Sequence, residues 1–116
     1  MNLGKYGESK AKEFLLSIGY DFLTQNFRYD RAEIDLIFKD ETNKVLIFIE
    51  VKTRRTKTFG EPEDSITPNK QNQLRKSAEG YLSSHEEFSE YEKRFDVVTI
   101  YIERGKEQIN HIVNAF

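Results

Sequence analysis

The stretch Lys44–Arg55, KVLIFIEVKTRR, decides the fold that the sequence predicts. A run of Val, Ile and Phe between polar residues is typical of a buried strand. Because side chains alternate along a strand, one face carries Val45, Ile47, Ile49 and Val51, and the other carries Leu46, Phe48, Glu50, Lys52 and Arg54. The second face is therefore apolar at its start and charged at its end. Removing such charges from water is costly unless something uses them.

The preceding stretch, Ala32–Lys39, is a second predicted strand with Ile34, Leu36 and Phe38 on one face and Glu33, Asp35 and Ile37 on the other. If the two strands form a hairpin across residues 40–43, Asp35 and Glu50 meet on one face with Lys52 beside them. Two carboxylates and a lysine suit a hard divalent cation and an activated water. An exposed, charged sheet end is the alternative, because acidic-x-Lys triplets also arise by chance, as at Glu8–Lys10.

The remaining pattern predicts an α/β fold in the order α-β-β-β-α-β-β, with a mixed sheet covered by both helices. The other expected elements are a helix over Leu3–Ile18, a strand over Tyr20–Arg28, a helix over Thr67–Ser83, and strands over Arg94–Glu103 and Gln108–Val113. Thr67 and Pro68 form an N-cap and first helical position. Residues 86–93 fit either a short helical turn or a loop.

Composition predicts a single domain over residues 1–116 and a cytoplasmic location. There is no apolar run of membrane-spanning length and no signal-peptide hydrophobic region at the N-terminus, so no membrane partner is expected. Absence of cysteine excludes disulfides and thiolate metal sites. The net charge of −2 argues against a general polyanion binder, yet residues 52–76 contain seven basic and three acidic side chains.

Two features near the candidate site have alternative interpretations. The basic segment Lys52–Lys57 is either a solvated loop or a phosphate-binding segment, since arginine binds phosphate through two parallel hydrogen bonds. Lys44 and Lys106 lie in predicted turns away from it. Glu8 lies beside glycines that permit close approach of a backbone or ligand, but it could equally be a solvated helix residue that pairs with a nearby lysine.

Several short motifs occur in order along nearly the whole chain. They are Gly4-x-x-Gly7-Glu8-x-x-Ala11, Asn26-x-Arg28, Glu33-Ile34-Asp35-Leu36-Ile37, Glu50-Val51-Lys52-x-Arg54, Phe59-Gly60, Lys70 and Arg94-Phe95-Asp96-Val97-Val98. This set resembles the YraN-like family of small bacterial proteins, which are regarded as endonucleases with a restriction-endonuclease-like PD-(D/E)XK core related to Holliday junction resolvases. The chain departs from the family at Ala32, where glycine is usual.

The resemblance implies a metal-dependent endonuclease that hydrolyses phosphodiester bonds in DNA, with branched or junction DNA among its expected substrates. Asp35 and Glu50 would hold Mg²⁺ or Mn²⁺, with the Val51 carbonyl as a further ligand. Lys52 would orient water or stabilise the transition state, and Glu8 would be an outer carboxylate or a ligand to a second metal. The other implied contributors are Glu33, which would support the metal site, and Arg54, Arg55, Lys57 and Lys70, which would grip the DNA backbone.

Two other functions are compatible with the same residues. A catalytically silent DNA-binding or adaptor protein would keep the fold and basic segment without needing Asp35, Glu50 and Lys52. A hydrolase of small phosphate esters would use the same metal site inside a closed pocket. A homodimer is a further expectation, for which the sequence offers no specific signal.

Overall fold

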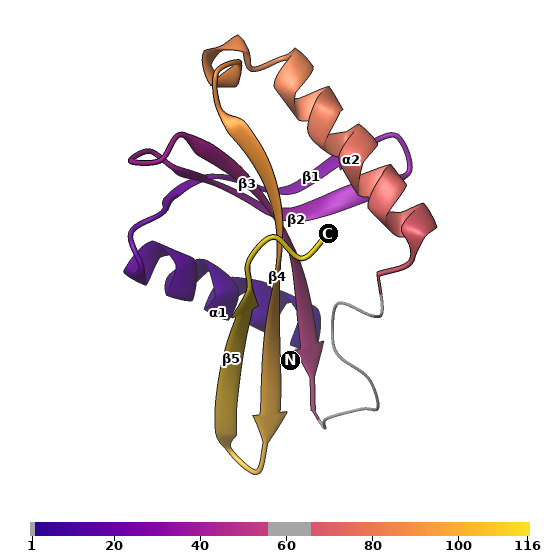
Figure 1. The fold of residues 1–116 in the computed structure, drawn as a ribbon. Coiled ribbons are helices and arrows are strands. Elements are labelled where there is room, and N and C mark those ends of the chain that lie inside the picture. The colour runs from indigo at the N-terminus through magenta and orange to yellow at the C-terminus, as the bar shows by residue number, and fades with distance from the viewer. Residues whose placement is uncertain (1, 56–65) are drawn as a thin grey trace.

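The computed structural model describes residues 2–55 and 66–116, and its elements confirm the predicted order (Figure 1). These are α1 (Leu3–Ser17), β1 (Asp21–Tyr29), β2 (Ala32–Asp40), β3 (Val45–Arg54), α2 (Pro68–Ser83), the 3-10 helix η2 (Glu86–Phe88), β4 (Glu92–Glu103) and β5 (Lys106–Ile112). The ambiguous stretch after α2 therefore begins with a single helical turn and ends in β4.

The strands form one mixed sheet in the order β1-β2-β3-β4-β5. Neighbouring strands are antiparallel except β3 and β4, which run parallel from Val45↔Glu92 to Arg54↔Tyr101. Parallel neighbours require a long crossover, and α2 lies within that connection. A five-stranded mixed sheet with a helix on each face is consistent with the restriction-endonuclease-like core.

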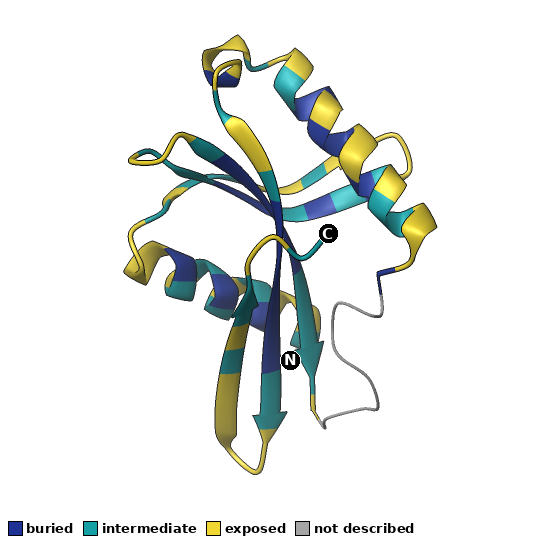
Figure 2. Cartoon of the chain, in the orientation of Figure 1, coloured by how far each residue is buried: buried dark blue, intermediate teal, exposed yellow. Residues whose placement is uncertain are grey.

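The two helices cover opposite faces of the sheet, as Figure 1 shows. Ala11 and Leu15 of α1 pack in a cluster with Ile47 and Ile49 of β3. Leu74, Ala78 and Tyr81 of α2 pack in a second cluster with Leu46 and Phe48. The alternation predicted for β3 is confirmed, and the buried residues in Figure 2 follow β3, β4 and the inner sides of both helices.

The predicted alternation of β2 fails at one position. Leu36 and Phe38 pack on the α1 side, whereas Ile34 belongs to the α2-side cluster. The pairing of β2 with β3 ends at Leu36↔Ile49, so Ile34 lies in the part of β2 that is no longer paired with β3. Strict alternation between two faces applies only while the strand remains within a regular sheet.

Local sequence explains where the elements begin. The Asn2 side chain accepts a hydrogen bond from Lys5 N at 3.0 Å, and Thr67 Oγ1 accepts one from Lys70 N at 3.1 Å. Each oxygen satisfies a backbone N–H that has no partner within its helix. In the β2–β3 turn, Asp40 Oδ1 accepts from Asn43 N at 3.2 Å, and the antiparallel pairing that starts at Asp40↔Val45 confirms the predicted hairpin.

The separation of β2 from β3 creates the most important local feature of the fold. Asp35 immediately precedes Leu36 and Glu50 immediately follows Ile49, the last paired residues of β2 and β3, while β3 continues beside β4 as far as Arg54. In Figure 1, β1 and β2 run across the view while β3, β4 and β5 extend downward. The polar residues predicted to form a site therefore lie where the sheet divides.

In the described part of the chain, none of the helices has the length and apolar character needed to cross a lipid bilayer.

Candidate functional site

Asp35 lies at the point where β2 leaves β3, and its side chain takes the place of the missing strand pairing. Its Oδ2 accepts a hydrogen bond from Val51 N at 2.8 Å. Burial and the nearby Glu50 carboxylate together raise the pKa of Asp35 to about 7, against the opposing effect of the Val51 hydrogen bond. Glu8 and Glu33 also contribute to the raised pKa. This carboxyl is therefore surrounded by negative charge that a bound cation would offset.

Glu50 is the buried carboxylate of the site and faces two lysines. Only 8% of the residue is exposed. Its Oε1 lies 3.5 Å from Lys52 Nζ, on the same strand, and 3.6 Å from Lys70 Nζ, in the first turn of α2. A buried carboxylate needs such partners, because removing its charge from water is costly. Two ammonium groups thus face one carboxylate oxygen from different elements.

Glu8 and Glu33 are joined by Asn26. The Asn26 amide donates to Glu8 Oε1 at 3.1 Å and to Glu33 Oε1 at 2.9 Å. Asn26 has a φ of 53° inside β1, a left-handed conformation that asparagine tolerates better than most residues. Glu33 also lies 3.8 Å from Arg28 Nη2, so it is held from two sides. Both glutamates are near enough to affect Asp35, but they are tied to a neutral amide.

The oxygen donors around Asp35 and Glu50 fit a hard divalent cation. In an extended strand the N–H and C=O of one residue point to the same side, so the Val51 carbonyl faces the gap that its N–H already faces. The oxygen of Asp35 that accepts from Val51 N is Oδ2, and the oxygen of Glu50 that the two ammonium groups approach is Oε1. Two carboxylates and a carbonyl suit Mg²⁺, which keeps several of its waters.

The structure does not gather a larger set of ligands. Across residues 2–55 and 66–116, no three His, Cys, Asp or Glu side chains are placed to hold one metal ion. Asp35 and Glu50 are brought together, with Lys52 beside Glu50. Glu8 and Glu33 lie at the edge of this group, bound to Asn26.

The expected DNA-binding residues are distributed along β3 and its continuation. Arg54 is half-buried at the end of β3, and Arg55 is exposed directly after it. Lys57 lies outside the described residues. Lys106 was expected to lie apart from the basic segment, but it lines a hollow of about 310 Å³ together with Arg55. The β4–β5 hairpin extends alongside the end of β3, so residues distant in sequence share this surface.

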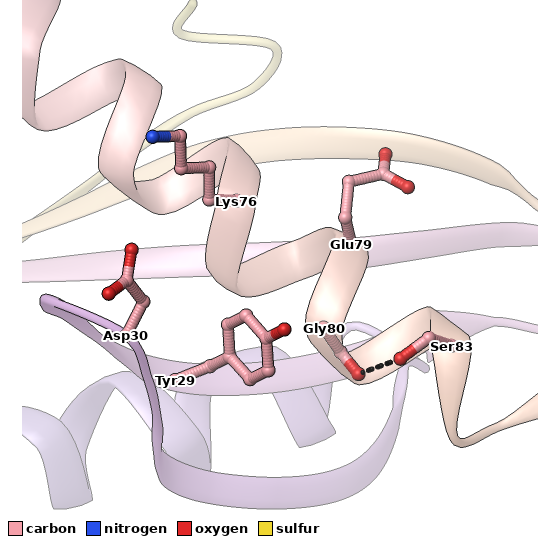
Figure 3. A pocket seen from close by; sticks show the side chains of 6 residues that line it. All are labelled: Tyr29, Asp30, Lys76, Glu79, Gly80 and Ser83. Atoms are coloured by element: carbon pink, nitrogen blue, oxygen red, sulfur yellow. Dashed lines mark hydrogen bonds between the residues drawn. The ribbon is translucent and has the colours of Figure 1, made fainter.

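A larger hollow lies between α2 and the end of β1 (Figure 3). Its volume is about 770 Å³, and its lining residues are Tyr29, Asp30, Lys76, Glu79, Gly80 and Ser83. The Tyr29 ring lies against Gly80, where a Cβ atom would come within 2.5 Å of the ring. None of the lining residues belongs to the candidate site, and their charges are of mixed sign.

Two contacts at the candidate site do not follow from the residue pattern. The motif Asn26-x-Arg28 does not predict the bridge to Glu8 and Glu33, although asparagine is one of the few residues that adopt a left-handed conformation readily. Lys70 was expected to grip DNA, yet its ammonium group lies beside Glu50. No local pattern reveals that contact, because it depends on where α2 begins relative to the sheet.

Comparison with known proteins places the chain among bacterial relatives. The model of the uncharacterised protein family UPF0102 matches residues 7–100, a range that includes every candidate residue named above. The chain belongs to the UPF0102 family. A UPF0102 protein of Syntrophomonas wolfei is 46% identical over 114 residues, covering 98% of this chain and 96% of the relative. A UPF0102 protein of Caldicellulosiruptor bescii is 43% identical over 122 residues and is covered completely, as is this chain.

A third UPF0102 relative, from Pelobacter propionicus, is 41% identical over 116 residues, covering 99% of this chain and 82% of the relative. The resemblance to the YraN-like family is thereby confirmed. UPF0102 is described as uncharacterised, so membership of the family does not by itself define an activity.

Proposed function

We propose that this UPF0102 protein is a metal-dependent endonuclease that hydrolyses phosphodiester bonds in DNA. The observation that carries the proposal is the meeting of Asp35 and Glu50 where β2 and β3 separate, with Lys52 and Lys70 facing Glu50. Crowded carboxylates beside ammonium groups suit a reaction in which a cation and a phosphate must both be held.

Asp35 and Glu50 would hold Mg²⁺ or Mn²⁺ through their carboxylate oxygens, with the Val51 carbonyl as a third donor. When bound, the ion would lower the pKa of a water molecule and stabilise charge on the phosphate. The Val51 N–H holds Asp35 in place at 2.8 Å, so this carboxylate is oriented before a ligand arrives. Orientation in advance reduces the entropic cost of reaching the transition state.

Lys52 would orient the attacking water or stabilise the negative charge that develops at phosphorus. Its side chain is 20% exposed and its ammonium lies 3.5 Å from Glu50, so it is held near the ligand set while remaining open to solvent. Glu8 would act as an outer carboxylate, and Glu33 would keep Asn26 and Glu8 in place. Both assignments follow from the Asn26 bridge rather than from direct contact with Asp35.

Cleavage of single-stranded, duplex, flap and four-way DNA in Mg²⁺ or Mn²⁺ tests the proposal directly. Asp35→Asn, Glu50→Gln and Lys52→Ala should each lower the rate by about 10²-fold or more, because positioned transition-state charge is lost. DNA binding in EDTA should survive in all three. Wild-type cleavage rates in Asp35→Asn would refute the proposal, and complete inactivity of the wild type on every substrate would favour the adaptor function instead.

The basic surface after β3 is tested by the salt dependence of DNA binding. Replacing Arg54 and Arg55 by glutamine should weaken binding and flatten the plot of log affinity against log salt, because fewer counterions are released. Lys106 is unsuitable as a control because it lines the same hollow as Arg55. Lys10, which pairs with Glu13 on α1, is a better control. Equal losses from Lys10→Gln and from the arginine changes would contradict this assignment.

A further inference from the structure

Lys70 occupies a position that sets it apart from the other basic residues expected to grip DNA. Its ammonium lies 3.6 Å from Glu50 Oε1, the same oxygen that Lys52 approaches at 3.5 Å. The backbone of Lys70 is fixed, since its N–H donates to Thr67 Oγ1 at 3.1 Å and Pro68 begins the helix. The first turn of α2 therefore places a second ammonium group, that of Lys70, beside Glu50 in the candidate site.

The carboxylates of the described chain do not offer ligands for two metal ions. Glu8 and Glu33 share the Asn26 amide, and Glu33 also pairs with Arg28. Among residues 2–55 and 66–116, no three metal-binding side chains are placed around one ion. Asp35 and Glu50 are therefore the carboxylates left to hold an ion, and the positive charge beside Glu50 comes from Lys52 and Lys70.

Hydrolysis of a phosphodiester places negative charge on both the attacking and the leaving oxygen. Two-metal enzymes stabilise both oxygens with a pair of ions. In a site with one ion, another positive group is needed near the second oxygen, and a lysine ammonium is a compact charge on a flexible stem. The Lys70 side chain is 42% exposed and the Lys52 side chain only 20%, so Lys70 is the one more open to an incoming phosphate.

We propose that Lys70 is a catalytic residue that binds the scissile phosphate and replaces a second metal ion. This inference rests on the proposed endonuclease function and adds a one-ion stoichiometry to it. When DNA binds, the Lys70 ammonium moves from Glu50 to the phosphate and stabilises the charge that develops as the bond from phosphorus to the leaving oxygen breaks. Water supplies the new oxygen on phosphorus, one of its protons passes to solvent, and the leaving oxygen takes a proton from solvent.

The test compares Lys70→Ala with Lys76→Ala, because Lys76 is an exposed lysine on the same helix outside the candidate site. Lys70→Ala should lower the single-turnover cleavage rate by about 10²-fold, the effect of removing one transition-state contact. Its DNA dissociation constant in EDTA should change less than that of Arg54→Gln/Arg55→Gln. Lys76→Ala should leave the cleavage rate unchanged, and Lys70→Arg should recover part of the activity.

Ion stoichiometry provides a measurement that does not depend on catalysis. Calorimetric titration of the wild type with Mn²⁺ should give one ion per chain, and Asp35→Asn should abolish that binding while Lys70→Ala retains it. Two Mn²⁺ ions per chain would overturn the inference, as would a wild-type cleavage rate in Lys70→Ala. If Asp35→Asn is inactive and Lys70→Ala is fully active, only the role of Lys70 fails. A wild type that cleaves no DNA overturns both proposals.

Discussion

The folded protein should lose stability as pH rises, because Asp35 ionises, and Asp35→Asn should remove this loss. Burial and the neighbouring Glu50 raise the pKa of Asp35 from 3.8 to about 7. A carboxyl with a raised pKa favours the folded state while it is protonated, and that stability is lost as pH rises from the unfolded toward the folded pKa. Each pKa unit corresponds to about 1.4 kcal/mol, so the full effect is on the order of 4 kcal/mol. Roughly 3 kcal/mol of it falls between pH 4.5 and pH 9.

Urea unfolding of the wild type and Asp35→Asn across this pH range measures the effect. Asparagine keeps an oxygen that can accept the Val51 hydrogen bond, so the difference between the two proteins isolates the charge. Glu13→Gln, on the exposed side of α1, is the matched surface control and should follow the wild type. Relative to the wild type, Asp35→Asn should become more stable by about 3 kcal/mol as pH rises through the range.

Divalent ions should offset the loss of folding stability that accompanies ionisation of Asp35. A ligand that binds only the folded protein stabilises it, and its effect grows with the ionised fraction of Asp35. Mg²⁺ or Mn²⁺ should therefore raise the melting temperature of the wild type more at pH 8 than at pH 5, and should have little effect on Asp35→Asn. If the two proteins show parallel pH profiles, the account of crowded, buried carboxylates is wrong.

Two further predictions concern packing and the buried charge network. Gly7→Ala should lower the free energy of unfolding by about 1–3 kcal/mol, because the new Cβ would lie 1.8 Å from Thr53 Oγ1. Urea unfolding measures this loss. Gly4→Ala is the control, because its Cβ would meet nothing closer than 3.5 Å. Recovery in Gly7→Ala/Thr53→Ala would identify the clash, and a neutral Gly7→Ala would disprove it. Burial alone would raise the pKa of Asp96, but hydrogen bonds from His111, Arg94 and Asn114 N hold it below its ordinary value. The stability that ionised Asp96 gives the folded protein is lost as pH falls below about 4. Asp96→Asn should lower the free energy of unfolding by about 3–5 kcal/mol near neutral pH. An acid unfolding curve unchanged in this variant would refute the assignment.

The sequence alone determined the order of the elements and the proximity of Asp35 and Glu50. Alternation along Val45–Arg54 and the turn at residues 40–43 place Asp35 and Glu50 near each other, because period-two burial and a short hairpin are local properties of the chain. The N-cap at Thr67 likewise follows from its own side chain. Each of these signals extends over a few residues, so each can be read without knowing the fold.

Only the tertiary structure decided what surrounds those carboxylates. Lys70 reaches Glu50 because the crossover between parallel strands starts α2 beside the end of β3. Asn26 joins Glu8 to Glu33 because α1 packs where β2 leaves β3. Lys106 lines the same hollow as Arg55 because β5 folds back along β4. These contacts depend on strand order, register and helix placement. Such features arise from burying the whole sheet at once, and no short segment specifies them.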